Sequence, residues 1–347
     1  AEYAEDHIPG AVSAPVLDDD ERAEVGTLYK QVSPFDAKKT GAALVAKNVS
    51  RHIDELFKGK DKGWRPLVYC WRGGKRSGAM AHILREIGWN AETLEGGYKA
   101  YRRFVVSELQ SLPGQFNFQV IHGPTGSGKS RLLGALQRAG AQVLDLEELA
   151  AHRGSVLGNL PDRPQPSQKM FESLLLREIS ELKSNKSVYV EGESKKIGQL
   201  QVPDALMERM RASPCIVLDT PVETRVDLLL EEYQHFLKDR QALHAQLDCL
   251  VALHGRERIA EWKAVADWRE LVRRLLVEHY DPAYRRSSHK NFTHLAHAHT
   301  VQIPRADDAA FSAAAAATLR RESDESRADR GACGRQQGCG DGGVPAP

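Results

Sequence analysis

The sequence lacks any apolar run approaching the ~18 residues that a membrane-spanning helix requires. It also lacks an excess of either charge, with 48 Lys and Arg against 47 Asp and Glu, so any nucleic acid would have to bind to local basic patches. Its five cysteines are odd in number and scattered, which argues against a disulfide framework and for a reducing compartment. We therefore expect a cytoplasmic protein without membrane contact.

The composition also excludes a wholly disordered protein, because 41% of the residues are hydrophobic and 27% are charged. The length of 347 residues exceeds the roughly 250–300 at which a single hydrophobic core stops growing. We predict one domain over residues 1–113, a second over 114–319, and a disordered tail over 320–347, where Ser, Asp, Arg and Gly dominate. Cys333 and Cys339 in that tail would make a poor metal site, since they have no further ligands.

The N-terminus, Ala1-Glu-Tyr-Ala-Glu-Asp6, has neither the basic start nor the apolar core of a signal peptide. It lacks an initiator Met, and we expect preceding residues to be missing.

Strand-like and helix-like segments alternate along most of the chain. Strands are expected at 66–70, 91–94, 116–122, 142–145, 187–191 and 215–219. Helices are expected at 77–87, 101–112, 128–139 and 168–182, with a linker at 111–115. After Pro221 the chain is expected to be almost wholly helical. The alternation predicts two α/β domains, each with a parallel sheet covered by helices on both sides, and a helical C-terminal part.

A cationic, glycine-containing loop follows the first expected strand and begins with Cys70. Successive backbone N–H groups in such a loop form an anion-binding concavity, and the next helix adds its positive N-terminal end. The predicted anion cradle comprises Arg72, Gly73, Gly74, Lys75, Arg76 and Ser77. These surroundings favour a thiolate, so Cys70 is the predicted nucleophile toward sulfur, selenium or phosphorus. Cys215 and Cys249 have no such surroundings and are expected in the core.

Residues 123–130, Gly-Pro-Thr-Gly-Ser-Gly-Lys-Ser, fit the Walker A pattern between an expected strand and an expected helix. Gly123, Gly126 and Gly128 would let the backbone wrap a di- or triphosphate, and Lys129 would neutralise it. The Ser130 hydroxyl would bind Mg²⁺. Glu191 is the favoured carboxylate for the same ion because its strand is expected beside the first one. Glu193 and Asp145 remain alternatives, as does Asp219 at another strand end.

Basic and aromatic residues are interleaved in the helical part, where they could grip phosphates and stack an unpaired base. The candidates for RNA contact are Arg273, Arg274, Arg285 and Arg286, in a region that also contains Arg256, Arg258, Arg269, Lys290, Trp262, Trp268, Tyr280 and Tyr284. Acidic residues share the region, so a solvated amphipathic helix explains the pattern equally well. His152-Arg153 and Lys195-Lys196 are alternative contacts. His289, His294, His297 and His299 are expected to lie on the surface rather than to bind metal.

The cysteine loop, together with Asp6-His-Ile-Pro-Gly-Ala11 upstream, resembles a rhodanese domain. Sulfur-transferring rhodaneses usually have four residues between the cysteine and the loop arginine, whereas five separate Cys70 from Arg76 here. The family's first strand and its acidic residue are absent, in keeping with missing N-terminal sequence. A larger ring of amides suits a larger anion.

A rhodanese-like domain followed by a P-loop domain resembles the bacterial tRNA 2-selenouridine synthase family, whose cysteine loop also reads Cys-x-Arg-Gly-Gly-x-Arg-Ser. Further family-like stretches are residues 145–155, 190–198 and 279–284. The resemblance implies replacement of sulfur by selenium in 2-thiouridine at wobble position 34 of the tRNAs for Lys, Glu and Gln. It implies geranyl diphosphate and selenophosphate as co-substrates, a Cys-bound selenium, and an enzyme that supplies selenophosphate. We expect Mg²⁺ at the P-loop and no tightly bound cofactor.

Two other functions are compatible with the motifs. One is a rhodanese–kinase fusion that uses ATP at the P-loop as a phosphotransferase or sulfurtransferase. The other is a non-catalytic RNA- or nucleotide-binding module with a vestigial rhodanese domain, which the intact Cys70 loop disfavours.

Overall fold

The computed structural model describes residues 1–155, 158–160, 162–192 and 194–336, without the side chains of 235, 287–291, 293 and 325–336. The chain divides into two units. Unit 1 is Ala1–Gln110 with Pro166–Arg177, and unit 2 is Ser111–Gln165 with the chain from Glu178 onward. The predicted domain boundary at residue 113 lies three residues beyond the end of the first segment of unit 1 at residue 110. Residues 166–177, predicted to be in the second domain, belong to unit 1. In the described ranges, each helix is too short or too polar to cross a lipid bilayer.

Unit 1 contains a short parallel pair, β1 (Leu67–Val68) with β2 (Glu92–Thr93). Its helices are α1 (Glu2–Glu5), α2 (Asp19–Gln31), α3 (Pro34–Glu55), α4 (Lys75–Ile87), α5 (Gly97–Ser111) and the first part of α8 (Gln168–Glu181). The predicted helix end at Gly88 is confirmed, because this residue caps α4 with φ of 105°. Val49, Met80, Leu84 and Trp89 form the core on which β1 lies.

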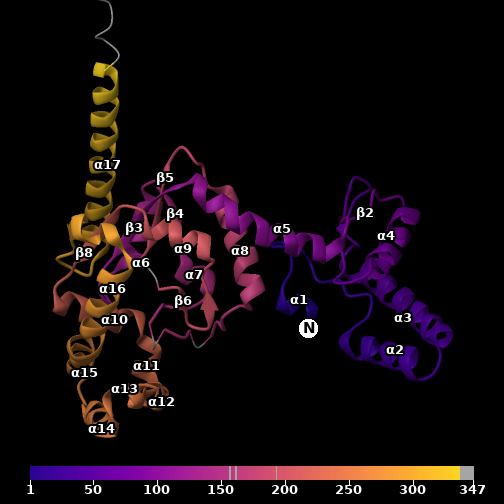
Figure 1. Ribbon diagram of the computed structural model, residues 1–347. Helices are drawn as coiled ribbons and strands as arrows, with labels where there is room; N and C mark the ends of the chain where they lie inside the picture. Colours follow the sequence, from indigo (N-terminus) through magenta and orange to yellow (C-terminus); the bar gives the residue numbers. More distant parts are fainter. Residues whose placement is uncertain (156–157, 161, 193, 337–347) are drawn as a thin grey trace, which may run out of the picture. The chain divides into compact units, whose positions relative to one another are not determined.

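Unit 2 is built on a parallel sheet whose described strands have the order β4-β5-β3-β8-β9. Figure 1 labels β3, β4, β5 and β8. The strands are β3 (Asn117–His122), β4 (Gln142–Leu144), β5 (Ser187–Glu191), β8 (Cys215–Asp219) and β9 (His299–Gln302). The expected position of β5 beside β3 is confirmed. The region after Pro221 is almost wholly helical, as expected, and β9 is an exception. This strand is too short to show a pattern of its own and pairs with β8 at the sheet edge.

One face of this sheet packs against α6 (Lys129–Arg138) and α17 (Asp308–Gln336). Ile121 and Tyr189 meet Leu132, Leu136 and Phe311 there. Unit 2 also contains η1 (Leu112–Gln115), α7 (Leu146–Ala150), the antiparallel pair of β6 (Lys196–Ile197) and β7 (Leu200–Gln201), and α9 (Asp204–Arg211). Helix α9 contacts β3. The expected linker at 111–115 is thus largely a 3-10 turn.

The prediction of disorder from residue 320 is wrong up to Gln336, where α17 ends. The run Ala313–Ala317 has high helix propensity, and the charged residues that follow are compatible with an exposed helix. Residues 337–347, including Cys339, lie outside the described residues, as does the side chain of Cys333.

The helical part comprises α10 (Val222–Glu232), α11 (Gln234–Lys238), α12 (Arg240–Asp248), α13 (Val251–His254), α14 (Arg256–Ala264), α15 (Trp268–Leu275), the π-helical turn η2 (Leu276–Tyr280), α16 (Asp281–Asn291) and η3 (Thr293–His297) (Figure 1). Leu243, Leu247, Ile259, Trp262 and Leu271 form a hydrophobic core of their own. This part therefore adds a second packed layer to unit 2 rather than a loose extension.

Candidate functional site

The cysteine loop joins the end of β1 to the start of α4, as predicted. Gly73 and Gly74 have φ of 73° and 67°, values that side chains rarely adopt, so they turn the backbone into the helix. The backbone N–H of Tyr98, at the start of α5, donates to the Cys70 carbonyl at 3.2 Å. The site is thus fixed by the first turns of two helices.

The Cys70 sulfur is half-buried beside polar groups. Its Sγ lies 3.4 Å from the Ser77 hydroxyl and 3.4 Å from the Arg72 carbonyl oxygen. Burial raises the pKa of the Cys70 thiol, but Ser77, the charge of Arg76 and the Gly74 amide together outweigh burial and lower it. This shift favours ionisation of Cys70, and a thiolate at neutral pH stays a prediction.

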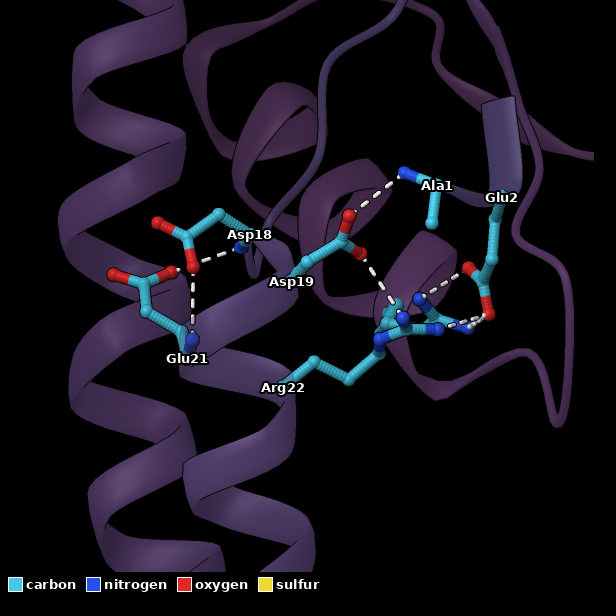
Figure 2. Close-up of polar contacts among 7 residues, drawn as sticks. Ala1, Glu2, Asp18, Asp19, Glu21 and Arg22 are labelled. Atoms are coloured by element: carbon cyan, nitrogen blue, oxygen red, sulfur yellow. Dashed lines mark hydrogen bonds and ion pairs between the residues drawn. The ribbon is translucent and has the colours of Figure 1, made fainter. Parts of the chain in front are cut away.

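The cationic residues of the cradle differ in their surroundings. Arg72 and Lys75 are exposed, whereas Arg76 pairs with Glu2 at 2.8 Å. Glu2 also accepts from Arg22 at 2.9 Å, and Figure 2 shows this pair beside the α2 capping box of Asp18 and Glu21. An incoming anion would have to compete with the Glu2 carboxylate for Arg76.

A buried carboxylate supports the loop from behind. Asp6, only 1% exposed, accepts hydrogen bonds from the hydroxyls of Tyr98 and Ser173, both at 2.8 Å. Tyr98 in turn stacks on Trp71 with 3.7 Å between ring centroids, and Lys169 lies over Trp71. Asp6 thereby positions the aromatic neighbour of Cys70.

The phosphate loop has the predicted context, between β3 and α6. Gly126 and Gly128 have φ of 76° and 86°. A Cβ at Gly126 would lie 2.9 Å from the Leu229 side chain, and one at Gly128 would lie 2.5 Å from Phe311. Both positions therefore exclude a side chain for two reasons, strained backbone and lack of space.

Hydrogen bonds link Ser130 to two carboxylates, of which the sequence predicts one, Glu191. Glu191 is fully buried at the end of β5, and its Oε1 accepts from the Glu147 backbone N–H at 2.8 Å. The Ser130 hydroxyl donates to Glu147 Oε2 at 3.2 Å. Glu147 was not predicted. Asp145 is also near, and burial raises its pKa, whereas Glu193 lies outside the described residues.

These oxygens fit a hard cation such as Mg²⁺, which prefers oxygen ligands and keeps several waters or phosphates. Within the described part of the chain, no three His, Cys, Asp or Glu residues form a metal-holding group. The residues would therefore hold Mg²⁺ together with a bound phosphate rather than by themselves.

A buried arginine fixes the phosphate loop from the other side. Arg225 on α10 donates from Nε and Nη2 to the Thr125 carbonyl at 2.9 and 2.8 Å. Its guanidinium pairs with Asp281 at 2.6 Å. His122, directly before the loop, is buried and its pKa is lowered to about 4 by burial and by Lys129. A neutral His122 thus adds no positive charge there.

Two family models match this chain: a rhodanese-like domain over residues 1–104 and the tRNA 2-selenouridine synthase AAA domain over residues 116–254. The tRNA 2-selenouridine synthase of Hydrogenovibrio crunogenus is 32% identical over 323 residues, which cover 82% of this chain and 85% of that protein. The chain belongs to the tRNA 2-selenouridine synthase family.

Other members of the family are more similar over a shorter stretch. The tRNA 2-selenouridine synthases of Nitrosomonas europaea and Bdellovibrio bacteriovorus are 39% and 38% identical over 67% of this chain. The aligned chain spans 61% and 62% of their lengths. The resemblance found in the two loops is thereby confirmed at the level of the family.

The candidate RNA residues lie in different surroundings. Arg273 pairs with Glu223 and Glu270, and Arg274 with Glu270, while Arg285 and Arg286 are exposed. Trp262 is fully buried, so the prediction that it could stack on a base is wrong. RNA contact by the four arginines stays a prediction, as it does for Lys195, which pairs with Asp204 at 2.6 Å, and Arg153, which lies 3.5 Å from Glu232.

Three further predictions concern cysteine and histidine. Cys215 is buried as expected, and burial raises its pKa to about 11. Cys249 is exposed, so its prediction as a core residue is wrong. It caps α12 between Leu247 and Leu250, which take the buried positions. His294 and His297 are exposed and His299 begins β9, while the side chain of His289 is outside the described residues.

Proposed function

We propose that the chain converts 2-thiouridine to 2-selenouridine at wobble position 34 of the tRNAs for Lys, Glu and Gln. The observation that carries the proposal is the presence, in one chain, of a cysteine whose pKa is lowered by an anion cradle and of a phosphate loop with its acidic partner strand. The relatives are named tRNA 2-selenouridine synthases, and this name describes the same product.

In the first step, geranyl diphosphate would bind with its diphosphate at the P-loop. The sulfur of 2-thiouridine attacks C1 of the geranyl group, the C–O bond breaks, pyrophosphate leaves, and the N3 proton of the base passes to water. Lys129 and the loop amides stabilise the charge on the departing oxygens. Ser130 and Glu191 would hold Mg²⁺, which supplies further charge neutralisation. The product, S-geranyl-2-thiouridine, has a better leaving group than the original thiocarbonyl because sulfur can depart as a geranylthiol.

In the second step, the Cys70 thiolate would attack the phosphorus of selenophosphate, so that an S–P bond forms, the P–Se bond breaks and selenium leaves as selenide. Arg72, Arg76 and the amides after Gly73 bind the phosphate of the donor. The selenide attacks C2 of the base, the C2–S bond breaks, and the geranylthiol departs. Water then hydrolyses the S–P bond, which releases phosphate and restores the Cys70 thiolate. The protein would act in the cytoplasm with an enzyme that supplies selenophosphate.

The test uses the full chain, Mg²⁺ and an anticodon stem-loop RNA with one 2-thiouridine. We expect the mass of a geranyl group to appear on the RNA with geranyl diphosphate, and 2-selenouridine to form when selenophosphate follows. ATP turnover without RNA, combined with an unchanged RNA mass, would instead establish the kinase alternative. An unchanged RNA mass without ATP turnover would contradict both enzymes.

A further inference from the structure

Unit 2 contains an apolar pocket beside the phosphate loop. Side chains from α10, α11, α12, α15 and η2 form its walls, including Leu229, Phe236, Leu243, Leu271 and Leu276. Thr125, from the phosphate loop itself, and Ser155 line it as well.

One end of the pocket meets the phosphate loop. Leu229 lines the pocket, and its Cδ1 lies 2.9 Å from the place of a Cβ on Gly126. Leu229 and Leu276 belong to one buried cluster. Since Arg225, one helical turn before Leu229, binds the Thr125 carbonyl, the start of α10 is fixed to the loop at this end.

The other end lies among residues of a different cluster. Tyr233 and Phe236 follow Leu229 along the chain, and Phe236 packs with Leu243 and Leu271 in the helical core. The pocket thus runs from the phosphate loop into the layer formed by α11, α12 and the first turns of α15.

The chemistry of the lining selects the kind of ligand. The described lining contains no charged side chain, and its polar atoms come from Thr125, Ser155 and aromatic rings. The Ser155 hydroxyl is 3.4 Å from that of Tyr233. A nucleobase and ribose need hydrogen-bond partners that such an apolar lining does not provide. A hydrocarbon chain gains free energy from leaving water there.

We propose that this pocket holds the hydrocarbon chain of the allylic diphosphate whose diphosphate binds the P-loop. The inference rests on the proposed function for the identity of the donor and adds the residues that bind its chain. Leu243, at the far end, then limits the chain length, and Leu229 lies near the reacting C1. Trp268 and Tyr280, two aromatic residues of the region considered for RNA contact, also line the pocket.

Binding to the full chain, measured by calorimetry with Mg²⁺, tests the pocket without any RNA. We expect geranyl diphosphate to bind at least about tenfold tighter than inorganic pyrophosphate, because burial of the chain adds to the phosphate contacts. Equal affinities for geranyl diphosphate and pyrophosphate would overturn the proposal, and so would tighter binding of ADP than of geranyl diphosphate.

Two substitutions at one position locate the chain. Leu243→Trp fills the far end and should remove the advantage of geranyl diphosphate over pyrophosphate while dimethylallyl diphosphate still binds. Leu243→Ala should shift the preference toward farnesyl diphosphate. Leu253→Trp is the matched control, because Leu253 is 70% exposed and outside the pocket. An unchanged chain-length preference in both Leu243 variants would refute the assignment.

These outcomes separate the pocket from the reaction. If geranyl diphosphate binds with the expected dependence on Leu243 but RNA is never alkylated, the proposed function fails and the pocket stands. If RNA is alkylated and no Leu243 variant alters the donor preference, the function stands and the pocket assignment fails.

Discussion

Arg225 and Thr125 are 100 residues apart in the chain, yet the arginine donates two hydrogen bonds to the threonine carbonyl. The Arg225 side chain is 4% exposed and its partner Asp281 is 19% exposed. The family-like stretch at 279–284 therefore acts on the phosphate loop through one buried ion pair. Arg225 is a positioning residue, since it acts through the backbone that wraps the phosphate.

Arg225→Ala should destabilise unit 2 by about 3–5 kcal/mol, because it leaves the Asp281 charge and the Thr125 carbonyl without their partner. Urea unfolding measures this loss. Arg225→Met with Asp281→Leu should recover part of the stability but not the affinity for pyrophosphate, because Thr125 is still not held.

Arg269→Met is the control for this pair. Arg269 and its partner Asp227 are each 45% exposed, so removing that pair should cost far less stability than removing Arg225. Equal losses for Arg225 and Arg269 would show that burial of the pair has no consequence.

Gly126→Ala should weaken pyrophosphate binding, at a cost of about 1–3 kcal/mol from the strained backbone and a further cost from the contact with Leu229. Gly140→Ala is a matched control, because its φ is 88° with no atom within 4 Å of the new Cβ. It should lose stability from strain and keep its affinity. Calorimetry with pyrophosphate compares the two, and equal affinity in both variants would contradict this account of the loop.

Ser77→Ala should raise the pKa of Cys70, since the Ser77 hydroxyl lowers that pKa in the intact protein. A rise of one unit reduces the thiolate fraction at neutral pH by up to about tenfold. The rate of alkylation by iodoacetamide should therefore fall at pH 7 and recover at higher pH. Cys249→Ser, Cys333→Ser and Cys339→Ser are introduced into both the Ser77→Ala variant and its Ser77 counterpart, so that these thiols do not compete. A superimposable pH profile would exclude the role of Ser77.

Glu191→Gln should raise the Mg²⁺ concentration required for pyrophosphate binding by about tenfold or more, since it removes the charge of a proposed ligand. Glu147→Gln is the informative comparison, because Glu147 contacts Ser130 directly. A Mg²⁺ titration of each variant decides between them. A larger effect at Glu147 would transfer the ligand role to that residue.

Acidification should destabilise unit 2 through His122. Its pKa is about 4 in the fold against an ordinary value of 6.5, so the unfolded chain binds the proton first. The contribution of neutral His122 to the free energy of unfolding is fully present above pH 6.5. It falls by up to about 3 kcal/mol as the pH approaches 4.

His122→Gln should remove that loss, measured as the difference in urea unfolding between pH 7 and pH 4.5. Part of the acid sensitivity should persist, because burial and His254 also lower the pKa of His279 to about 4. His294→Gln, at an exposed position, should change nothing. If His122→Gln is as sensitive to acid as the unaltered protein, His122 has no role in this loss of stability.

Local sequence predicted the two loops well because each is a continuous motif between a strand and a helix. Each loop spans eight consecutive residues, 70–77 around Cys70 and 123–130 around Lys129. The arrangement of the residues within each loop therefore follows from the local turn. The supports of those loops were not predictable. Asp6 meets Ser173, and Glu147 meets Glu191, only through the tertiary fold.

The wrong predictions have the same origin. Cys249 follows Leu247 and precedes Leu250, but the end of α12 turns it outward. Trp262 was grouped with surface aromatics, whereas it is the centre of the helical core and donates to Glu278 at 3.0 Å. Burial on a helix depends on which neighbours cover it, which a short pattern does not determine.

The most direct test of the account compares Cys70→Ala with Lys129→Ala by mass spectrometry of a 2-thiouridine RNA treated with geranyl diphosphate and selenophosphate. We predict that Cys70→Ala accumulates the S-geranyl nucleoside without selenium, and that Lys129→Ala leaves 2-thiouridine unchanged. Geranylation that persists in Lys129→Ala while selenation is lost would contradict the assignment of the two loops to the two steps.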